Sequence, residues 1–217
     1  HVQNVSALPA APLRLGYGRV RLLWDDADAP RWKLLASGVD AKPVKKGGLT
    51  ELSFAVPLAK QPEMPADAPT RFTHPPLFEL STFASWADVS KTMAPLYATD
   101  GLIADGSPLA GELAKLKALP GSPKERAAAA LQLVQDHVRY LMVGMNGGNY
   151  VPQKPAETWT LRYGDCKAKT LLLLSLLRGL GIEAEPVLAS STLGDSVPER
   201  LPTAAAFDHV LVRAVID

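Results

Sequence analysis

One segment dominates the sequence: Gly164-Asp-Cys-Lys-Ala-Lys-Thr-Leu-Leu-Leu-Leu-Ser-Leu-Leu-Arg-Gly179. The leucine-rich stretch predicts a buried helix, because so apolar a segment must pack against other elements. Asp165 is suited to cap the first turn, and Gly179 is suited to end the helix. The chain has a single cysteine, Cys166, and it falls in the first turn of this predicted helix.

Cys166 is the strongest candidate for chemistry. A lone cysteine is more often an inert buried residue, but a helix N-terminus favours the reactive thiolate through the helix dipole and unsatisfied N–H groups. A nucleophilic thiol also needs a base within hydrogen-bond reach. His209 lies on a predicted strand that can return beside the helix, so the sequence predicts Cys166 as nucleophile and His209 as base.

The segments around this helix predict a mixed α+β core. Apolar spacing predicts helices over residues 86–97 and 122–140, the second beginning with the cap and proline of Ser122-Pro123. Alternation predicts strands over residues 183–190 and 207–216. The glycine-rich stretch from Gly144 to Gly148, and the chain onward to Trp159, is expected to be a loop.

The first third of the chain predicts β structure. Short apolar or alternating segments at residues 13–23, 32–35 and 49–58 are separated by turn-type residues, among them a solvated turn at Lys45-Lys46. Five prolines between residues 61 and 76 predict an irregular connector: Pro62, Pro65, Pro69, Pro75 and Pro76. We therefore expect a β-rich, sandwich-like segment with its connector at residues 1–76 and an α+β core at residues 77–217.

Several motifs resemble transglutaminase-like proteins, which are related to papain. They are Arg162-Tyr-Gly-Asp-Cys166-Lys, Gly179-Leu-Gly-Ile-Glu-Ala-Glu-Pro-Val-Leu188, Leu201-Pro202 and Phe207-Asp-His209-Val. More narrowly, the chain is similar to a bacterial branch in which this core follows a β-rich domain of unknown function, joined by a segment like Ser81-Thr-Phe-Ala-Ser-Trp86. The resemblance implies a papain-like core in which the cysteine helix packs on an antiparallel sheet. It also implies export, for example to the periplasm.

The family's nucleophile and base carry over onto Cys166 and His209 and imply a thioester formed from an amide or peptide carbonyl. Water as acceptor would make the protein a peptidase or amidase, and an amine would make it a transglutaminase. The alternative is a non-catalytic module that binds a peptide or a cell-envelope component and keeps a vestigial thiol. Retention of both Cys166 and His209 argues against this alternative.

The chain departs from the family pattern in two places. Ala168 stands where related sequences often carry an acid, a change expected to affect packing more than chemistry. The family's third triad residue is usually an Asp on the strand after the histidine. On an extended strand Asp217 would lie about 26 Å from His209, and Asp208 would face the opposite side. We therefore expect the sheet to be incomplete here and the triad acid to be missing.

The remaining site residues follow from the chemistry. The Cys166 backbone N–H is expected to stabilise the oxyanion together with one side-chain donor from the preceding loop. The candidates for this donor are Trp159, Asn146, Asn149 and Gln153. Asp165 is interpreted as a helix cap rather than a catalytic acid.

Composition favours a small-molecule or protein substrate, and the resemblance narrows this expectation to a protein or peptide. The 23 Lys and Arg residues balance 22 Asp and Glu residues, so nucleic acid is not indicated. No apolar run reaches the roughly 20 residues that span a bilayer. No cofactor or metal is expected, because the Gly144–Gly148 stretch lacks the lysine and serine of a phosphate-binding loop, and no histidine has metal-ligand spacing with Cys166. The other histidines, His1, His74 and His137, are interpreted as surface or structural residues.

Overall fold

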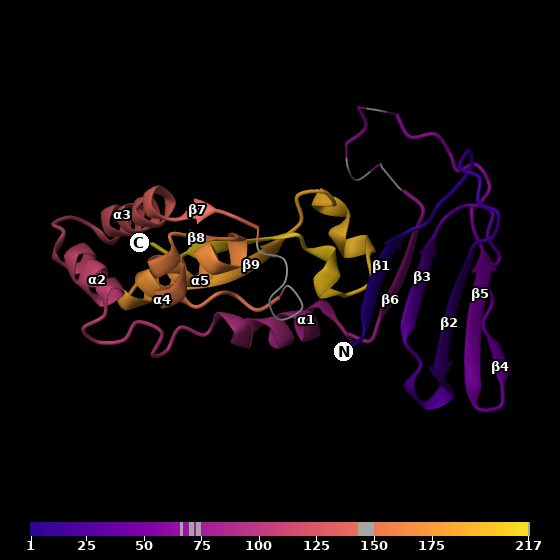
Figure 1. The fold of residues 1–217 in the computed structure, drawn as a ribbon, viewed down its shortest axis with the longest axis horizontal. Helices are drawn as coiled ribbons and strands as arrows, with labels where there is room; N and C mark the ends of the chain where they lie inside the picture. Colours follow the sequence, from indigo (N-terminus) through magenta and orange to yellow (C-terminus); the bar gives the residue numbers. More distant parts are fainter. Residues whose placement is uncertain (66, 70–71, 73–74, 143–149, 217) are drawn as a thin grey trace. The chain divides into compact units, whose positions relative to one another are not determined.

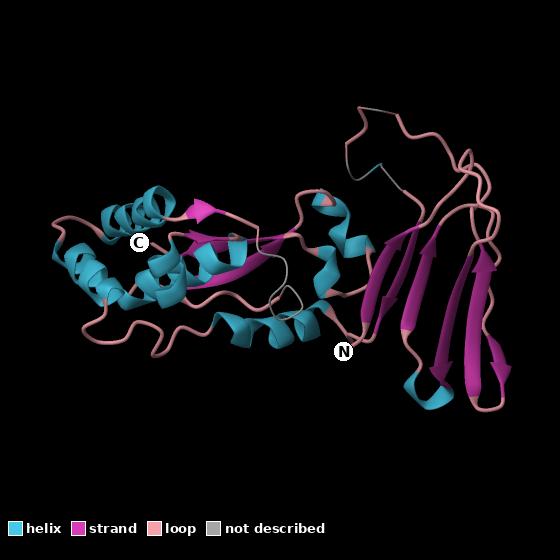
Figure 2. Cartoon of the chain, in the orientation of Figure 1, coloured by secondary structure: helices cyan, strands magenta, loops and turns pink. Residues whose placement is uncertain are grey.

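The computed structural model describes residues 1–65, 67–69, 72, 75–142 and 150–216. Within them the chain is a mixed α+β protein with five α-helices and several antiparallel sheets (Figure 2). Two compact units are formed. Unit 1 comprises His1–Val89 and Ser190–Ala206, and unit 2 comprises Ser90–Ala189 and Phe207–Asp217. The sequence-based boundary at residue 76 remains a prediction about domain organisation.

Unit 1 contains two three-stranded antiparallel sheets (Figure 1). In the first, β6 lies between β1 and β3, and in the second β5 lies between β2 and β4. The strands are β1 (Gln3–Ala7), β2 (Arg19–Asp25), β3 (Arg31–Leu35), β4 (Val44–Lys46), β5 (Leu49–Ala55) and β6 (Leu77–Ser81). The β-rich prediction for this part of the chain is confirmed, but Lys45 and Lys46 belong to β4 rather than to a turn.

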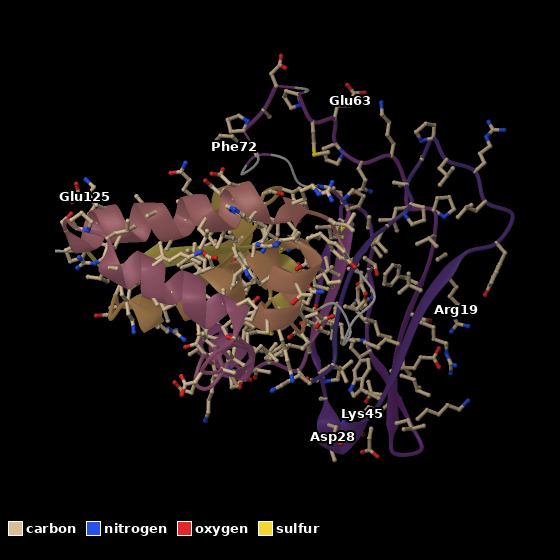
Figure 3. All side chains as sticks on the ribbon, turned by 60° about the vertical axis from the view of Figure 1, so that its left-hand side comes forward. Arg19, Asp28, Lys45, Glu63, Phe72 and Glu125 are labelled. Carbon is tan, nitrogen blue, oxygen red and sulfur yellow. The ribbon has the colours of Figure 1, made fainter. Side chains whose placement is uncertain are left out.

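Alternation along the strands builds the core of unit 1. Leu52 and Phe54 of β5 share a buried cluster with Phe78 and Leu80 of β6, and the two phenylalanine rings meet edge to face at 5.8 Å. The other face of the second sheet is charged, and Figure 3 shows Arg19 on it. The Arg19 Nη2 lies 2.5 Å from a Glu51 carboxylate oxygen. The second sheet therefore has one apolar face and one solvated face.

Unit 2 is built around the predicted leucine-rich helix. This helix, α5 (Cys166–Gly179), packs against α3, α4, β9 and β10 (Figure 1). Leu172, Leu174 and Leu176 are fully buried. The other elements of unit 2 are α2 (Pro108–Ala118), α3 (Pro123–His137), β7 (Arg139–Tyr140), α4 (Pro155–Leu161), β8 (Tyr163–Gly164), β9 (Ala184–Ala189) and β10 (His209–Ala214). Helix α1 (Trp86–Met93) begins in unit 1 and ends in unit 2.

Local signals explain where these helices begin and end. Ser122 and Glu125 form a reciprocal capping box at the start of α3, the end at which Figure 3 places Glu125. These hydrogen bonds from Ser122 hold the pKa of the Glu125 carboxyl below its usual value. Helix α1 gives way to a 3-10 turn at Ala94–Tyr97, where Pro95 supplies no N–H.

The structure corrects the sequence predictions for unit 2. The helix expected over residues 122–140 ends at His137, and Arg139–Tyr140 form β7. The chain approaching Trp159 was expected to be a loop, but residues 155–161 form α4, with Pro155 at its first position and Trp159 buried. A proline favours a helix start because it needs no N–H partner there. Helix α2 also begins with a proline, Pro108, and Ser107 is its cap. The apolar spacing did not predict this helix.

Because α5 is buried, replacing its leucines with smaller residues should strongly lower the free energy of unfolding. Leu174→Ala should lower the free energy of unfolding by about 2–5 kcal/mol, because it leaves a cavity in a closely packed core. Leu131→Ala is the matched control, since Leu131 lies on α3 and is 42% exposed. Urea unfolding followed by far-UV circular dichroism measures both variants. Equal losses in the two would contradict the central place of α5.

Candidate functional site

Cys166 is the first residue of α5, and Asp165 is the N-cap. The Asp165 carboxylate accepts a hydrogen bond from the Ala168 N–H at 3.0 Å, and its other oxygen lies 2.5 Å from the Lys167 Nζ. The interpretation of Asp165 as a cap is thus confirmed. Only 7% of the Asp165 side chain is exposed.

The thiol of Cys166 is half-buried, and two tyrosines lie near it. Strand β7 pairs in parallel with β8, which sets Tyr140 beside Gly164, two residues before Cys166. The Leu141 N–H donates to the Gly164 carbonyl at 3.1 Å. This pairing of two very short strands brings the end of α3 to the start of α5.

The Tyr140 hydroxyl interacts with the Cys166 thiol. Partial burial of the hydroxyl, and then the charge and hydrogen bonding of Cys166, raise the pKa of Tyr140. Tyr97 is only 2% exposed, and burial followed by the charges of Cys166 and Asp165 raises its pKa as well. Both phenols therefore stay protonated at neutral pH, and Tyr140, which hydrogen-bonds with Cys166, can act as a donor toward a thiolate. Sequence reasoning missed them, because it placed Tyr140 inside the predicted helix 122–140, whereas α3 ends at His137 and Tyr140 lies on β7.

His209 is the first residue of β10 and pairs with Ala189 of β9. The Thr170 hydroxyl on α5 donates to the Val210 carbonyl at 3.2 Å. Cys166 lies one helical turn before Thr170, and His209 lies one residue before Val210. Along the helix axis, Cys166 is therefore about 6 Å from Thr170, and along the strand, His209 is about 3 Å from Val210. The predicted nucleophile and base thus lie near the same end of α5 and β10.

The imidazole of His209 is half-buried. The next residue, Val210, is 3% exposed and belongs to the apolar cluster around α5. Among the described residues, the hydrogen bonds do not include one between the Cys166 thiol and this imidazole. Catalytic hydrogen bonds are often long without substrate, and the assignment of the pair remains a prediction.

The predicted oxyanion donors separate into three groups. Trp159 is buried, with the Arg162 guanidinium 3.7 Å above its ring. Gln153 lies beside the approach to Cys166, because a Cβ added to Gly164 would come within 3.4 Å of its Oε1, which accepts the Thr158 hydroxyl at 3.0 Å. Asn146 and Asn149 lie outside the described residues. The role of Gln153 as the side-chain donor to the oxyanion remains a prediction, and its position beside Gly164 supports it.

Close packing accounts for Ala168. A Cβ on Gly164 would lie 2.7 Å from the Ala168 Cβ, and Ala168 is 1% exposed. A carboxylate at residue 168 would therefore be buried against the backbone that leads into Cys166. Small residues at both positions let β8 approach the first turn of α5 closely.

The other titratable candidates lie elsewhere. His1 stacks on Phe83 at 4.0 Å, and His137 is exposed on α3, where its ring nitrogen contacts the Leu133 carbonyl. The Asp208 N–H donates to the Ala189 carbonyl at 3.2 Å, and the residue is exposed. His74 and Asp217, together with the Gly144–Gly148 stretch, fall outside the described residues.

Among the described residues, no group of three or more His, Cys, Asp and Glu side chains is arranged to hold a metal ion. None of the helices in that part of the chain has the length and apolar character to cross a membrane.

Comparison with known proteins gives a likeness of fold. No family model matches the chain, and no curated protein matches it. A crystal structure of a protein from Parabacteroides distasonis, named as a candidate protease, superimposes with a TM-score of 0.71 over 91% of this chain at 17% identity. This chain spans 38% of the length of that protein. A protein from Cytophaga hutchinsonii, named as a candidate cysteine protease, gives a TM-score of 0.42 at 12% identity over 99% of this chain and 71% of its own.

The contact between Tyr140 and Cys166 predicts a role for the phenol in thiol reactivity. Tyr140→Phe removes a donor that stabilises the thiolate, so alkylation of Cys166 by iodoacetamide at pH 7 should slow about fivefold, as for a hydrogen bond of about 1 kcal/mol. The pH profile should also move to higher pH. Tyr17→Phe, on a residue that is 83% exposed in unit 1, is the control. An unchanged or faster reaction of Tyr140→Phe would exclude the donor role.

Proposed function

We propose that the chain carries the site of a cysteine-dependent enzyme that attacks amide carbonyls of protein or peptide substrates. Cys166 is the nucleophile and His209 is the base. The observation that carries this proposal is the position of the half-buried thiol at the first residue of α5, a buried helix, because its dipole and N–H groups favour the thiolate. The fold shared with a protein named as a candidate protease agrees with it.

The proposed reaction has two halves. The Cys166 Sγ, its proton passed to His209, attacks the carbonyl carbon, and the backbone N–H of Cys166 donates to the oxyanion. The C–N bond then breaks, and the imidazolium of His209 returns the proton to the leaving amine, so that a thioester remains. In the second half, an acceptor loses a proton to His209, attacks the thioester and releases the Cys166 thiol.

The acceptor determines the class of enzyme. Water gives a carboxylic acid and makes the protein a peptidase or amidase, whereas an amine gives a new amide and makes it a transglutaminase. We place hydrolysis first, because the fold neighbour is named as a protease. The related architecture implied by the sequence motifs favours an exported protein, and the substrate would then be a peptide outside the cytoplasm.

Alkylation of Cys166 tests the proposed pair without knowledge of the substrate. His209→Ala should slow the reaction with iodoacetamide at pH 7 by about tenfold, because the imidazole no longer takes the thiol proton. His137→Ala is the matched control, since His137 is exposed on α3. Mass spectrometry of the modified chain measures the rates.

Equal rates in the two histidine variants and the parent chain would overturn the catalytic pair and favour the binding-module alternative. If the pair is present, a peptide library incubated with the protein should give Cys166-dependent products. Cys166→Ser provides the background in that experiment, since it keeps the size of the side chain but lacks the thiol.

A further inference from the structure

Two tyrosines of unit 2 lie near the Cys166 thiol, but only one of them is open to a substrate. Tyr97 is 2% exposed and belongs to the apolar core around α5. Tyr140 is 53% exposed, and its hydroxyl hydrogen-bonds with the thiol. A carbonyl group that approaches the sulfur of Cys166 can therefore also contact the hydroxyl of Tyr140.

Backbone contacts on both sides of Tyr140 hold it to the elements that carry the thiol. On one side, the Val138 carbonyl accepts a hydrogen bond from the Lys169 Nζ of α5 at 2.6 Å. On the other side, the Leu141 N–H donates to the Gly164 carbonyl at 3.1 Å. Both partners lie within three residues of the cysteine in the sequence. The backbone of Tyr140 is therefore held beside the start of α5 by contacts inside unit 2.

A donor that contacts the sulfur also lies close to the place where an oxyanion forms. When a thiolate attacks a carbonyl group, the negative charge moves to the carbonyl oxygen, and a single carbon atom separates this oxygen from the sulfur. An effective oxyanion donor lies about 3 Å from that oxygen. The backbone N–H of Cys166 is expected to supply one donor, and the hydroxyl of Tyr140 is placed to supply the second.

A phenol can donate to an oxyanion only while it keeps its proton. Partial burial, followed by the charge and hydrogen bonding of Cys166, raises the pKa of Tyr140. An ordinary thiol ionises near a pKa of about 8.5 and an ordinary phenol near about 10. The hydroxyl of Tyr140 therefore remains a donor over the pH range in which the thiol ionises.

Gln153 is the rival donor from the same side of α5. Its Oε1 accepts a hydrogen bond from the Thr158 hydroxyl at 3.0 Å, so the glutamine is bonded to α4. The hydroxyl of Tyr140 instead bonds the reacting atom itself. This difference favours Tyr140.

We propose that Tyr140 is a catalytic residue whose hydroxyl donates to the oxyanion formed when Cys166 attacks a carbonyl group. The inference rests on the proposed function for the role of Cys166 as nucleophile. It assigns the side-chain donor to a residue outside the four candidates that the sequence suggested.

Two reagents separate this role from a simple effect on the thiol. Iodoacetamide is attacked at a saturated carbon, where the S–C bond forms as iodide leaves, and no oxyanion develops. 4-Nitrophenyl acetate is attacked at its carbonyl carbon, so that an oxyanion forms, 4-nitrophenolate then leaves with the electron pair of the broken C–O bond, and an acetyl thioester remains. Only the second reaction requires an oxyanion donor.

Both rates are measured on the plateau of each variant's alkylation pH profile, where the thiol is fully ionised. Differences in thiol ionisation then do not contribute. Absorbance of 4-nitrophenolate gives the acylation rate after subtraction of the rate of Cys166→Ser, and mass spectrometry gives the alkylation rate.

Tyr140→Phe should lower the ratio of acylation rate to alkylation rate by at least about tenfold, because one oxyanion donor is lost. Tyr17→Phe, on an exposed residue of unit 1, should leave the ratio unchanged. Gln153→Ala should lower it less than Tyr140→Phe does. Far-UV circular dichroism checks folding, and Tyr140→Leu is a second variant in case Tyr140→Phe does not fold.

An unchanged ratio in Tyr140→Phe, with acylation still dependent on Cys166, would overturn the inference and leave the proposed function standing. A ratio that falls in Gln153→Ala but not in Tyr140→Phe would do the same and would assign the donor to Gln153. Acylation of the parent chain no faster than that of Cys166→Ser would overturn the inference and the proposed function together.

Discussion

The burial of α5 is the constraint on which unit 2 depends. Its leucines fill the core, so the helix cannot shift along its axis without opening cavities. The hydrogen bond from the Ala168 N–H to the Asp165 carboxylate then fixes where the helix begins. Because Cys166 occupies the first position, core packing determines where the thiol stands, and no flexible loop carries it.

Unit 1 depends on a different kind of contact. One face of its first sheet joins an apolar core, while the other is buried by matched polar groups and the Glu79–Arg200 pair. A buried ion pair adds little net stability compared with apolar packing, but it penalises every wrong register. This buried polar face therefore favours one position of the segment that covers it over all others.

The sequence predicted the parts of the structure that local signals govern. Helix α5 follows from a leucine run with a cap and a terminal glycine, and α3 follows from Ser122-Pro123 and its capping box. Strands β9 and β10 follow from alternation. The sequence also placed Cys166 at the start of the helix and His209 on the strand where the structure has them, while their catalytic roles remain predictions. Residues 155–161 were missed because their helix is short and begins with a proline after an irregular stretch.

Contacts between distant segments could not be predicted. Tyr140 reaches the thiol only because two-residue strands pair in parallel, and strands this short leave no periodicity in a sequence. The buried face of β6 also escaped, because Leu77–Ser81 contains a glutamate and a serine that local patterns assign to solvent. Their burial comes from residues more than a hundred positions later in the chain.

The candidate residues share one structural property, which is that each lies at the end of an element. Cys166 begins α5, His209 begins β10 and Tyr140 ends β7. Element ends offer unpaired backbone N–H groups and side chains that the core does not hold, and both properties are useful for chemistry. They also leave orientation undefined, so each end requires its own support. Asp165 caps the helix that carries the thiol, pairing with β8 holds the strand of Tyr140, and pairing with Ala189 of β9 holds the backbone of His209.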